Sequence, residues 1–228
     1  MKFRNTILQK MPAAGLQQLA PDLTSHKMRR RHRIETQNRA IAHVYFPETC
    51  VISVFSNAGE DTRVEAGMVG FEGASGVAVI LGDHRSPHDT YVQVAGEAMR
   101  ASAESVRRLM QENGEARRLL LHFANVLTIQ TAHTALANGR ASIEQRLARW
   151  LLMAHDRVGD PVPVAHDCTA AMLGVRRADV TNGLRALEAD GLVECVRGKV
   201  SIIDHAGLSR RAGAIYGVPE AEYRRLIG

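Results

Sequence analysis

The sequence predicts an α+β fold with an N-terminal antiparallel β-roll, a long helix and a mainly helical C-terminal domain. Short apolar segments separated by Gly, Pro, Asn and Asp fill residues 44–99, and many short strands at close spacing are typical of a jelly-roll-like barrel. After residue 100 the apolar residues recur every three or four positions, which is the period of helices. Residues 3–24 have the same period, so short helices are expected in front of the strands.

Composition excludes several classes of protein. The chain has 228 residues, of which 45% are hydrophobic and 23% are charged, as in ordinary globular proteins. No stretch approaches the roughly 20 apolar residues of a membrane span, and the first residues contain no apolar signal-peptide core. We therefore expect a cytoplasmic protein without a membrane partner. The net charge of +5 favours a polyanionic partner.

Cysteine usage indicates neither a disulfide framework nor a zinc site. The sequence has three cysteines, Cys50, Cys168 and Cys195, and no two of them form a CxxC pair. We expect no bound metal or cofactor on this basis.

Three helices are predicted after the strands, at residues 102–113, 115–137 and 143–157. A left-handed cap at Asn113-Gly114 is expected to end the first helix, and Asn138-Gly139 is expected to break the second. The implied domains are residues 1–113, 114–138 and 139–228.

The second of these helices has a stripe of residues at the spacing of a helix–helix seam, apolar at its start and small or polar toward its end. Its members are Leu120, Phe123, Leu127, Gln130 and Thr134. Two arrangements fit this stripe: it packs against the β-roll of its own chain, or it pairs with the same helix of a second copy. The second arrangement would make residues 114–138 a dimerisation helix.

Residues 164–188 have the pattern of two short helices that cross at a tight angle. Ala170 is the small residue that such a crossing needs, and Gly174 supplies positive φ where the chain turns. The second helix begins near Arg177, and Asp179 in its first turn interacts favourably with the helix dipole. The expected shared core consists of Leu173, Val175, Val180, Leu184 and Leu187.

Two strand patterns, at residues 193–196 and 200–203, follow this pair of helices. They flank a basic turn with Arg197 and Lys199, whose charges suit contact with phosphate. Helix, turn, helix and hairpin in this order predict a winged helix-turn-helix.

The residues of the second helix that are not core positions form a cationic outer face without large apolar side chains. Its residues are Arg176, Arg177, Ala178, Thr181, Asn182 and Arg185. Arginine can pair with guanine O6 and N7, asparagine with adenine N6 and N7, and a threonine methyl can touch thymine. The sequence therefore predicts binding of double-stranded DNA in the major groove. A winged helix used only for contacts with another protein is the alternative.

With these motifs, nearly the whole chain resembles the bacterial Crp/Fnr family of transcription regulators. The resemblance is carried by residues 44–47, residues 64–70, the long helix and residues 172–177. It implies a β-roll like a cyclic-nucleotide-binding domain and a homodimer that regulates transcription from near-palindromic operators. The partners that it implies are double-stranded DNA, a second copy of the chain and RNA polymerase.

The reading helix departs from the family pattern. The family often has Ser-Arg-Glu followed by a second Arg, whereas the equivalents here are Arg176, Arg177, Ala178 and Asn182. Gly183 replaces the usual apolar residue late in the helix. The half-site of the best-known members therefore does not carry over to this chain.

The effector site departs further from the family pattern. An effector pocket would use Glu72, Arg85 and Ser86, which only partly match the Gly-Glu and Arg-Ser motifs for ribose and cyclic phosphate. We do not expect a cyclic nucleotide. The cysteine cluster that holds an iron–sulfur centre in oxygen-sensing members is absent, and no His or Cys stands out as a haem ligand.

A metal-binding cupin or an enzyme is the main rival hypothesis. Asp83, His84, His88 and Asp89 cluster in one segment, and two histidines with a carboxylate could ligate iron or manganese. However, residues 82–87 look like a turn, which would place these side chains at a solvent-facing tip. There is no GxSxG, P-loop or Rossmann glycine pattern, so we do not expect an enzyme.

Overall fold

The structure, a computed structural model, describes residues 2–59 and 62–228. The chain divides into two compact units. The first contains residues 1–54, 69–128 and 222–228, and the second contains residues 55–68 and 129–221. This division does not coincide with the boundaries expected at residues 113 and 138, because the long helix contributes to both units and residues 55–68 join the second unit.

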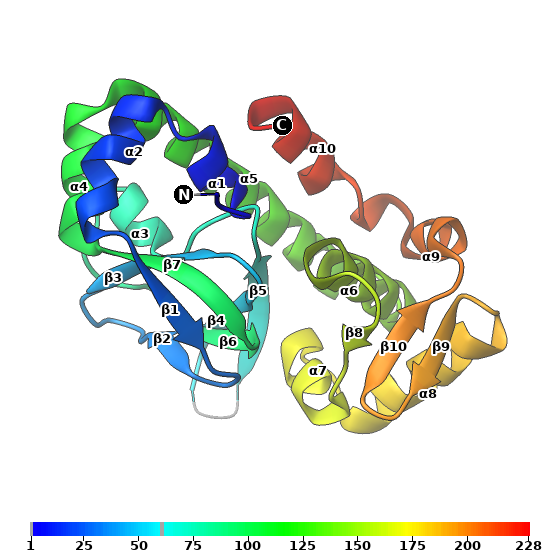
Figure 1. The fold of residues 1–228 in the computed structure, drawn as a ribbon. Helices are drawn as coiled ribbons and strands as arrows, with labels where there is room; N and C mark the ends of the chain where they lie inside the picture. Colours follow the sequence, from blue (N-terminus) through cyan, green and yellow to red (C-terminus); the bar gives the residue numbers. More distant parts are fainter. Residues whose placement is uncertain (1, 60–61) are drawn as a thin grey trace. The chain divides into compact units, whose positions relative to one another are not determined.

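The strands of the N-terminal half form two antiparallel sheets, as the sequence predicts (Figure 1). One sheet has the order β1 (Thr24–Met28), β7 (Gly96–Ser102) and β3 (His43–Pro47). Ser25 and Phe46 both lie opposite Met99 of β7 in this sheet. The other sheet has the order β2 (Arg33–Glu35), β6 (Asp89–Val94), β4 (Val51–Asn57) and β5 (Arg63–Val69).

Short helices precede, interrupt and follow these strands in the chain. They are α1 (Thr6–Lys10), α2 (Ala13–Leu19), η1 (Ala20–Asp22), α3 (Val77–Ile80) and α4 (Ala103–Glu112). Asn5 caps α1 by accepting a hydrogen bond from the Leu8 amide at 3.1 Å, and Ser102 caps α4. The run from Val77 to Leu81 is ambiguous in sequence, and the structure makes most of it helical. The core of this unit includes the buried side chains of Ile7, Phe46, Ile52, Leu109 and Leu120.

The helix α5 (Gly114–Arg140) is longer than the sequence predicts. The expected left-handed cap at Asn113-Gly114 is wrong: Asn113 is extended, and its side chain accepts a hydrogen bond from the Ala116 amide at 2.9 Å. Asn113 therefore starts α5. The expected break at Asn138-Gly139 is also wrong, since one glycine in a helix costs only about 1 kcal/mol and does not by itself end it. The chain leaves the helix at Ala141 and Ser142, and Ser142 forms a capping box with Gln145 at the start of the next helix.

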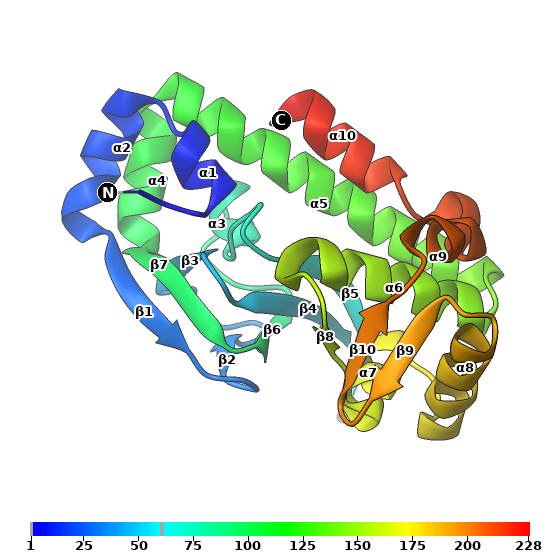
Figure 2. The same cartoon turned by 45° about the vertical axis from the view of Figure 1, so that its right-hand side comes forward.

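The second unit contains the predicted winged helix-turn-helix (Figure 2). Its helices are α6 (Ile143–Val158), α7 (His166–Leu173), α8 (Arg177–Ala189), α9 (His205–Ala212) and the short η2 (Gly213–Ile215). Its antiparallel sheet has the order β8 (Val162–Pro163), β10 (Lys199–Ile202) and β9 (Val193–Val196). The sequence predicts β9 and β10 but not β8, α9 or the last helix, α10 (Val218–Leu226). No helix in the described part of the chain is long and apolar enough to cross a membrane.

Candidate nucleic-acid interface

The α7–α8 turn has the geometry that the sequence predicts. Gly174 ends α7 in the left-handed region, with φ 61° and ψ 41°, and its amide donates to the Ala170 carbonyl. Ala170 is buried, as a small residue at a helix crossing should be. Arg146 of α6 donates to the carbonyl of Leu173, the last residue of α7. These contacts fix the position from which α8 begins.

Gly183 lets α6 approach α8 closely. A Cβ atom on Gly183 would lie 3.1 Å from Leu147 Cδ2 and 3.6 Å from Ile143 Cγ2, both on α6. A larger side chain would require the two helices to shift. The family pattern has an apolar side chain at this position, whereas here Gly183 has none and α6 lies close to α8 instead.

The inner face of α8 is buried, with Val180, Leu184 and Leu187 at 3% exposure or less, while the outer face is exposed. The exposed members are Arg176, Arg177, Ala178, Asn182 and Arg185. In the described part of the chain, the side chains of Asn182 and Arg185 have no hydrogen-bond or ion-pair partner. Asn182 and Arg185 lie three positions apart, so they neighbour each other on the helix surface.

The two arginines at the start of α8 already have carboxylate partners. Arg176 donates from Nε and Nη2 to Asp179, each at 3.2 Å, and these bonds raise the pKa of Arg176 and lower the pKa of Asp179. Arg177 Nη1 lies 3.4 Å from Asp167 Oδ1, and both side chains are more than two-thirds exposed. Ion pairs at the protein surface contribute little to the free energy of folding. Either guanidinium group can therefore leave its carboxylate partner and bind a phosphate.

Thr181 is half-buried and uses its hydroxyl inside the protein. Its Oγ1 donates to the Arg177 carbonyl at 3.2 Å and lies 2.9 Å from His166 Nδ1, which connects α8 to the first residue of α7. The methyl group is the part of Thr181 that remains for contact with a thymine.

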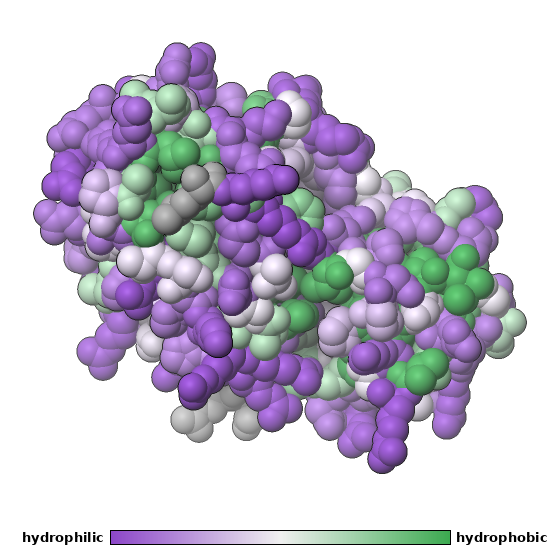
Figure 3. Space-filling view, in the orientation of Figure 1, coloured by the Kyte–Doolittle hydropathy of each residue, from purple (hydrophilic) through white to green (hydrophobic). Residues whose placement is uncertain are grey.

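The hairpin of β9 and β10 ends in a tight basic turn. Arg197 and Lys199 are exposed on either side of Gly198, which has φ 79°. Neither side chain has an ion-pair partner among the described residues. Figure 3 shows hydrophilic side chains projecting from this end of the hairpin. The turn therefore has the exposed positive charge that the sequence predicts for a wing.

Comparison with known proteins identifies this arrangement. Residues 145–211, which include α7, α8 and the hairpin, match the family model of the Crp-like helix-turn-helix domain. The chain carries a Crp-like helix-turn-helix domain. No curated protein sequence matches the chain.

Solved structures share the fold over most of the chain. The Crp-family transcriptional regulator TTHB099 of Thermus thermophilus is 18% identical, with a TM-score of 0.68 over 83% of this chain and 97% of that protein. FixK2 of Bradyrhizobium japonicum is 13% identical, with a TM-score of 0.71 over 84% and 98%. The c-di-GMP-responsive global regulator CLP of Xanthomonas campestris is 15% identical, with a TM-score of 0.67 over 84% and 99%. At these identities the likeness establishes the fold, which is that of Crp/Fnr regulators and confirms the resemblance seen in the sequence.

Outside the Crp-like domain, two of the three residues predicted for an effector pocket, Glu72 and Ser86, use their side chains in hydrogen bonds within the protein. The Glu72 carboxylate accepts hydrogen bonds from the Gly70 amide at 3.0 and 3.1 Å. Ser86 is buried, and its Oγ lies 3.0 Å from Glu35 Oε2. Arg85 is exposed, and its backbone forms an isolated bridge with Ala40.

Glu35 is the residue of this region that sequence reasoning missed. It is only 8% exposed, and Oε1 accepts from the Gly76 amide at 2.8 Å. Its Oε2 accepts from Ser86 Oγ at 3.0 Å and from Thr90 Oγ1 at 3.2 Å. A single glutamate in a short strand gives no signal in sequence, because its partners lie 41 to 55 residues away.

The stripe predicted on the long helix packs largely within the protein. Leu120 and Phe123 are 0% and 2% exposed in the core of the first unit. Gln130, in the second unit, is 4% exposed and exchanges two hydrogen bonds with the backbone of Met68. Leu127 and Thr134 are half-buried. Of the two arrangements that the sequence left open, the structure favours packing within the chain for these residues.

The segment considered for a cupin-type metal site is an exposed turn only at Asp83 and His84. The expected solvent-facing position is wrong for the other two residues, because His88 is half-buried and Asp89 begins β6 with its side chain 13% exposed. Asp83 Oδ1 accepts from the amides of His84 and Arg85, and its pKa is lowered by these bonds. Asp89 accepts from the Gln37 amide at 2.9 Å. Within the described residues, this segment brings no three ligating atoms together.

Proposed function

We propose that this protein is a transcription regulator that binds double-stranded DNA through α8 and the hairpin wing. The observation that carries the proposal is the outer face of α8, where exposed cationic and amide side chains project from a helix whose inner face is buried. Such a face, in a Crp-like helix-turn-helix, matches the dimensions and the charge of the DNA major groove.

Different residues of this face suit different parts of the DNA. Asn182 and Arg185, which are exposed and without partners among the described residues, are proposed to contact base edges. Arg176 and Arg177 lie at the start of α8, where the positive end of the helix dipole favours anions, and are proposed to hold phosphates. Ala178 and the Thr181 methyl offer apolar contact to thymine. The wing residues Arg197 and Lys199 are proposed to contact a further phosphate.

The proposed active form is a homodimer that reads a near-palindromic operator. Besides the buried stripe, α5 has an exposed series at alternating spacings of four and three residues, the spacing of a coiled-coil seam. It comprises Leu121, Asn125, Thr128, Ala132 and Ala135. Pairing of this face in two copies would place two reading helices on one side of the DNA, about one helical turn apart. RNA polymerase is the proposed further partner.

The DNA-competent state is proposed to need no cyclic nucleotide. In the family pattern, the residue at Ser86 would bind a cyclic phosphate. Here the Glu35 carboxylate already takes hydrogen bonds from Ser86, Thr90 and the Gly76 amide. A phosphate at the same donors would have to displace this carboxylate or lie beside its negative charge.

Selection of bound sequences from a random duplex pool, with the full-length protein, tests the proposed function. The expected result is enrichment of a near-palindromic sequence and an affinity that falls steeply as the salt concentration rises, because bound side chains displace counterions. The proposal is wrong if no sequence is enriched and duplex DNA does not bind even at low ionic strength.

A further inference from the structure

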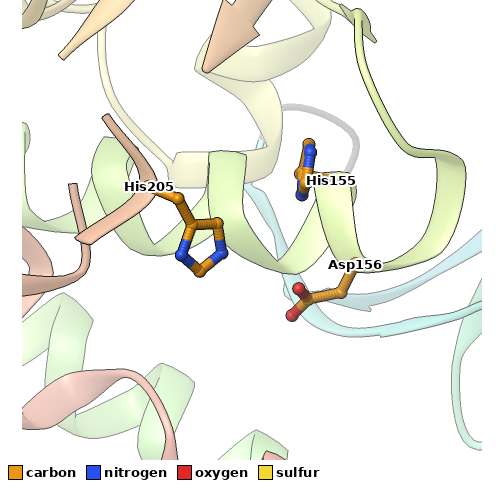
Figure 4. Close-up of side chains that lie close together, drawn as sticks. All are labelled: His155, Asp156 and His205. Atoms are coloured by element: carbon orange, nitrogen blue, oxygen red, sulfur yellow. The ribbon is translucent and has the colours of Figure 1, made fainter. Parts of the chain in front are cut away.

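Three side chains with metal-ligating atoms lie close together in the second unit, away from the reading face of α8. His155 and Asp156 lie near the end of α6, and His205 is the first residue of α9. Each contributes a ligating atom, and these atoms all lie within 4.8 Å of one another. Figure 4 shows the three side chains around a common space, with the Asp156 carboxylate turned toward His205.

A fourth residue, Tyr216, orients the carboxylate of this group. Its hydroxyl donates to Asp156 Oδ2 at 2.8 Å. This hydrogen bond fixes one oxygen of the Asp156 carboxylate and leaves the other oxygen to coordinate a metal ion. Hydrogen bonds that orient ligating carboxylates in this way are typical of metal sites.

We propose that His155, Asp156 and His205 bind one divalent transition-metal ion of the Zn²⁺ type. Two imidazole nitrogens and one carboxylate oxygen form a ligand set that Zn²⁺ accepts, with water in the fourth position. In a tetrahedral site, ligands about 2.1 Å from the ion lie about 3.4 Å apart, so a pair at the 4.8 Å limit must approach by about 1.4 Å. Asp156 and His205 are exposed, so rotation of their side chains can bring the ligating atoms together.

The ion would connect two helices that have no covalent link near this point. α6 packs on α8 through Leu147 and Gly183, and α9 follows directly after the wing strand β10. Because a ligand that binds only the folded state stabilises it by mass action, occupation of the site should raise the stability of the unit that carries the reading helix.

Titration of the full-length protein, with any affinity tag removed, tests this site. The probes are Zn²⁺ in calorimetry and Co²⁺ in visible absorption. One ion per chain is expected for the wild type, and His205→Gln should weaken binding at least tenfold. His84→Gln is the matched control, because His84 is also exposed and lies beside a carboxylate, with Nδ1 3.6 Å from Asp83 Oδ1.

Two further measurements separate a specific site from general surface binding. Zn²⁺ should raise the melting temperature of the wild type and of His84→Gln, but not that of His205→Gln. Tyr216→Phe keeps all three ligands and should bind about tenfold more weakly, since loss of an orienting hydrogen bond typically costs 10- to 100-fold.

The site does not exist if the wild type binds no ion, if His205→Gln binds as well as the wild type, or if His84→Gln loses as much affinity as His205→Gln. An unchanged affinity in Tyr216→Phe would remove the orienting role of the hydroxyl. None of these measurements involves DNA, so their outcome tests the metal site independently of the proposed function.

Discussion

Two predicted functional regions of this protein use their polar side chains in opposite ways. In the β-roll, Glu35, Glu72 and Ser86 form hydrogen bonds with other groups of their own unit. On α8, Asn182 and Arg185 are exposed and have no partner in the described part of the chain. The first set is used to build the fold, whereas the second is left for another molecule.

This contrast follows from the cost of burial. A buried carboxylate is stable only when hydrogen bonds replace the water that it loses, and Glu35 has three such bonds. An exposed guanidinium keeps its water at no such cost until a ligand replaces it. Burial and the state of the hydrogen bonds therefore distinguish Glu35, which holds the structure, from Asn182 and Arg185, which are proposed to contact DNA.

The largest expected effect is on the β-roll side of this contrast. Replacing Glu35 with Ala leaves the Gly76 amide and the Thr90 hydroxyl without this acceptor, whereas the Ser86 hydroxyl keeps the His88 carbonyl at 2.7 Å. We expect the free energy of unfolding to fall by about 2 kcal/mol or more, because each buried group left unsatisfied costs about 1–3 kcal/mol. Urea denaturation measures the change.

Glu97→Ala is the control for this substitution, since Glu97 is exposed on β7 of the same unit. It should change the free energy of unfolding by less than about 0.5 kcal/mol. If Glu35→Ala is as mild as this control, the hydrogen bonds of Glu35 do not hold the β-roll together.

The next effect is on the DNA side. Arg185→Ala should weaken binding to the selected operator by about 1–3 kcal/mol and relax the preference at one base pair, because a bidentate arginine–guanine contact is lost. Fluorescence anisotropy with the operator and with single-base variants measures both quantities. Arg224→Ala, which removes another exposed arginine, from α10, should leave affinity unchanged. Equal losses in the two variants would mean that charge alone, and not base contact, explains the role of Arg185.

A smaller effect is expected at the wing. Lys199→Ala should weaken binding to all duplexes alike and reduce the slope of log affinity against log salt by about 1, because one phosphate contact is lost. The base preference obtained from selection should stay the same. An unchanged salt slope would show that Lys199 does not contact phosphate.

The sequence predicts the reading region well because its signals are local. Ala170, Gly174 and the apolar positions of α8 all lie within 25 residues. Gly174 is required by the positive φ of the turn, and the others by the close packing of the two helices. The hairpin is equally local, with Gly198 at positive φ between two strands. Nothing distant in the chain is needed to specify these elements.

The regions that the sequence misses depend on distant contacts. Glu35 is defined by three partners that are far away in the chain, and the stripe on α5 is compatible both with a second copy and with the protein's own core. Asn113 shows the same limit on a smaller scale, since an Asn-Gly pair can end one helix or cap the next. Only the hydrogen bond to the Ala116 amide decides between the two.

The smallest expected effect is that of cyclic nucleotides on DNA binding, and it tests the contrast between the β-roll and α8 most directly. Addition of cyclic AMP or cyclic GMP should change the affinity for the operator by less than about twofold, because a ligand shifts a conformational equilibrium only when it binds one state more tightly than the other. Ser86, one of the two residues that would bind a cyclic phosphate, is hydrogen-bonded to Glu35, and the Glu35 carboxylate would repel the phosphate, whereas Arg85 is exposed. Anisotropy titrations with and without nucleotide test this, and Glu35→Gln is the informative comparison because it removes the charge but keeps the size of the side chain.

A nucleotide response that appears only in Glu35→Gln would identify the carboxylate as the group that excludes the ligand. A response of about tenfold or more in the wild type would show instead that the β-roll accepts an effector despite its internal hydrogen bonds, and the distinction between the two regions would no longer hold.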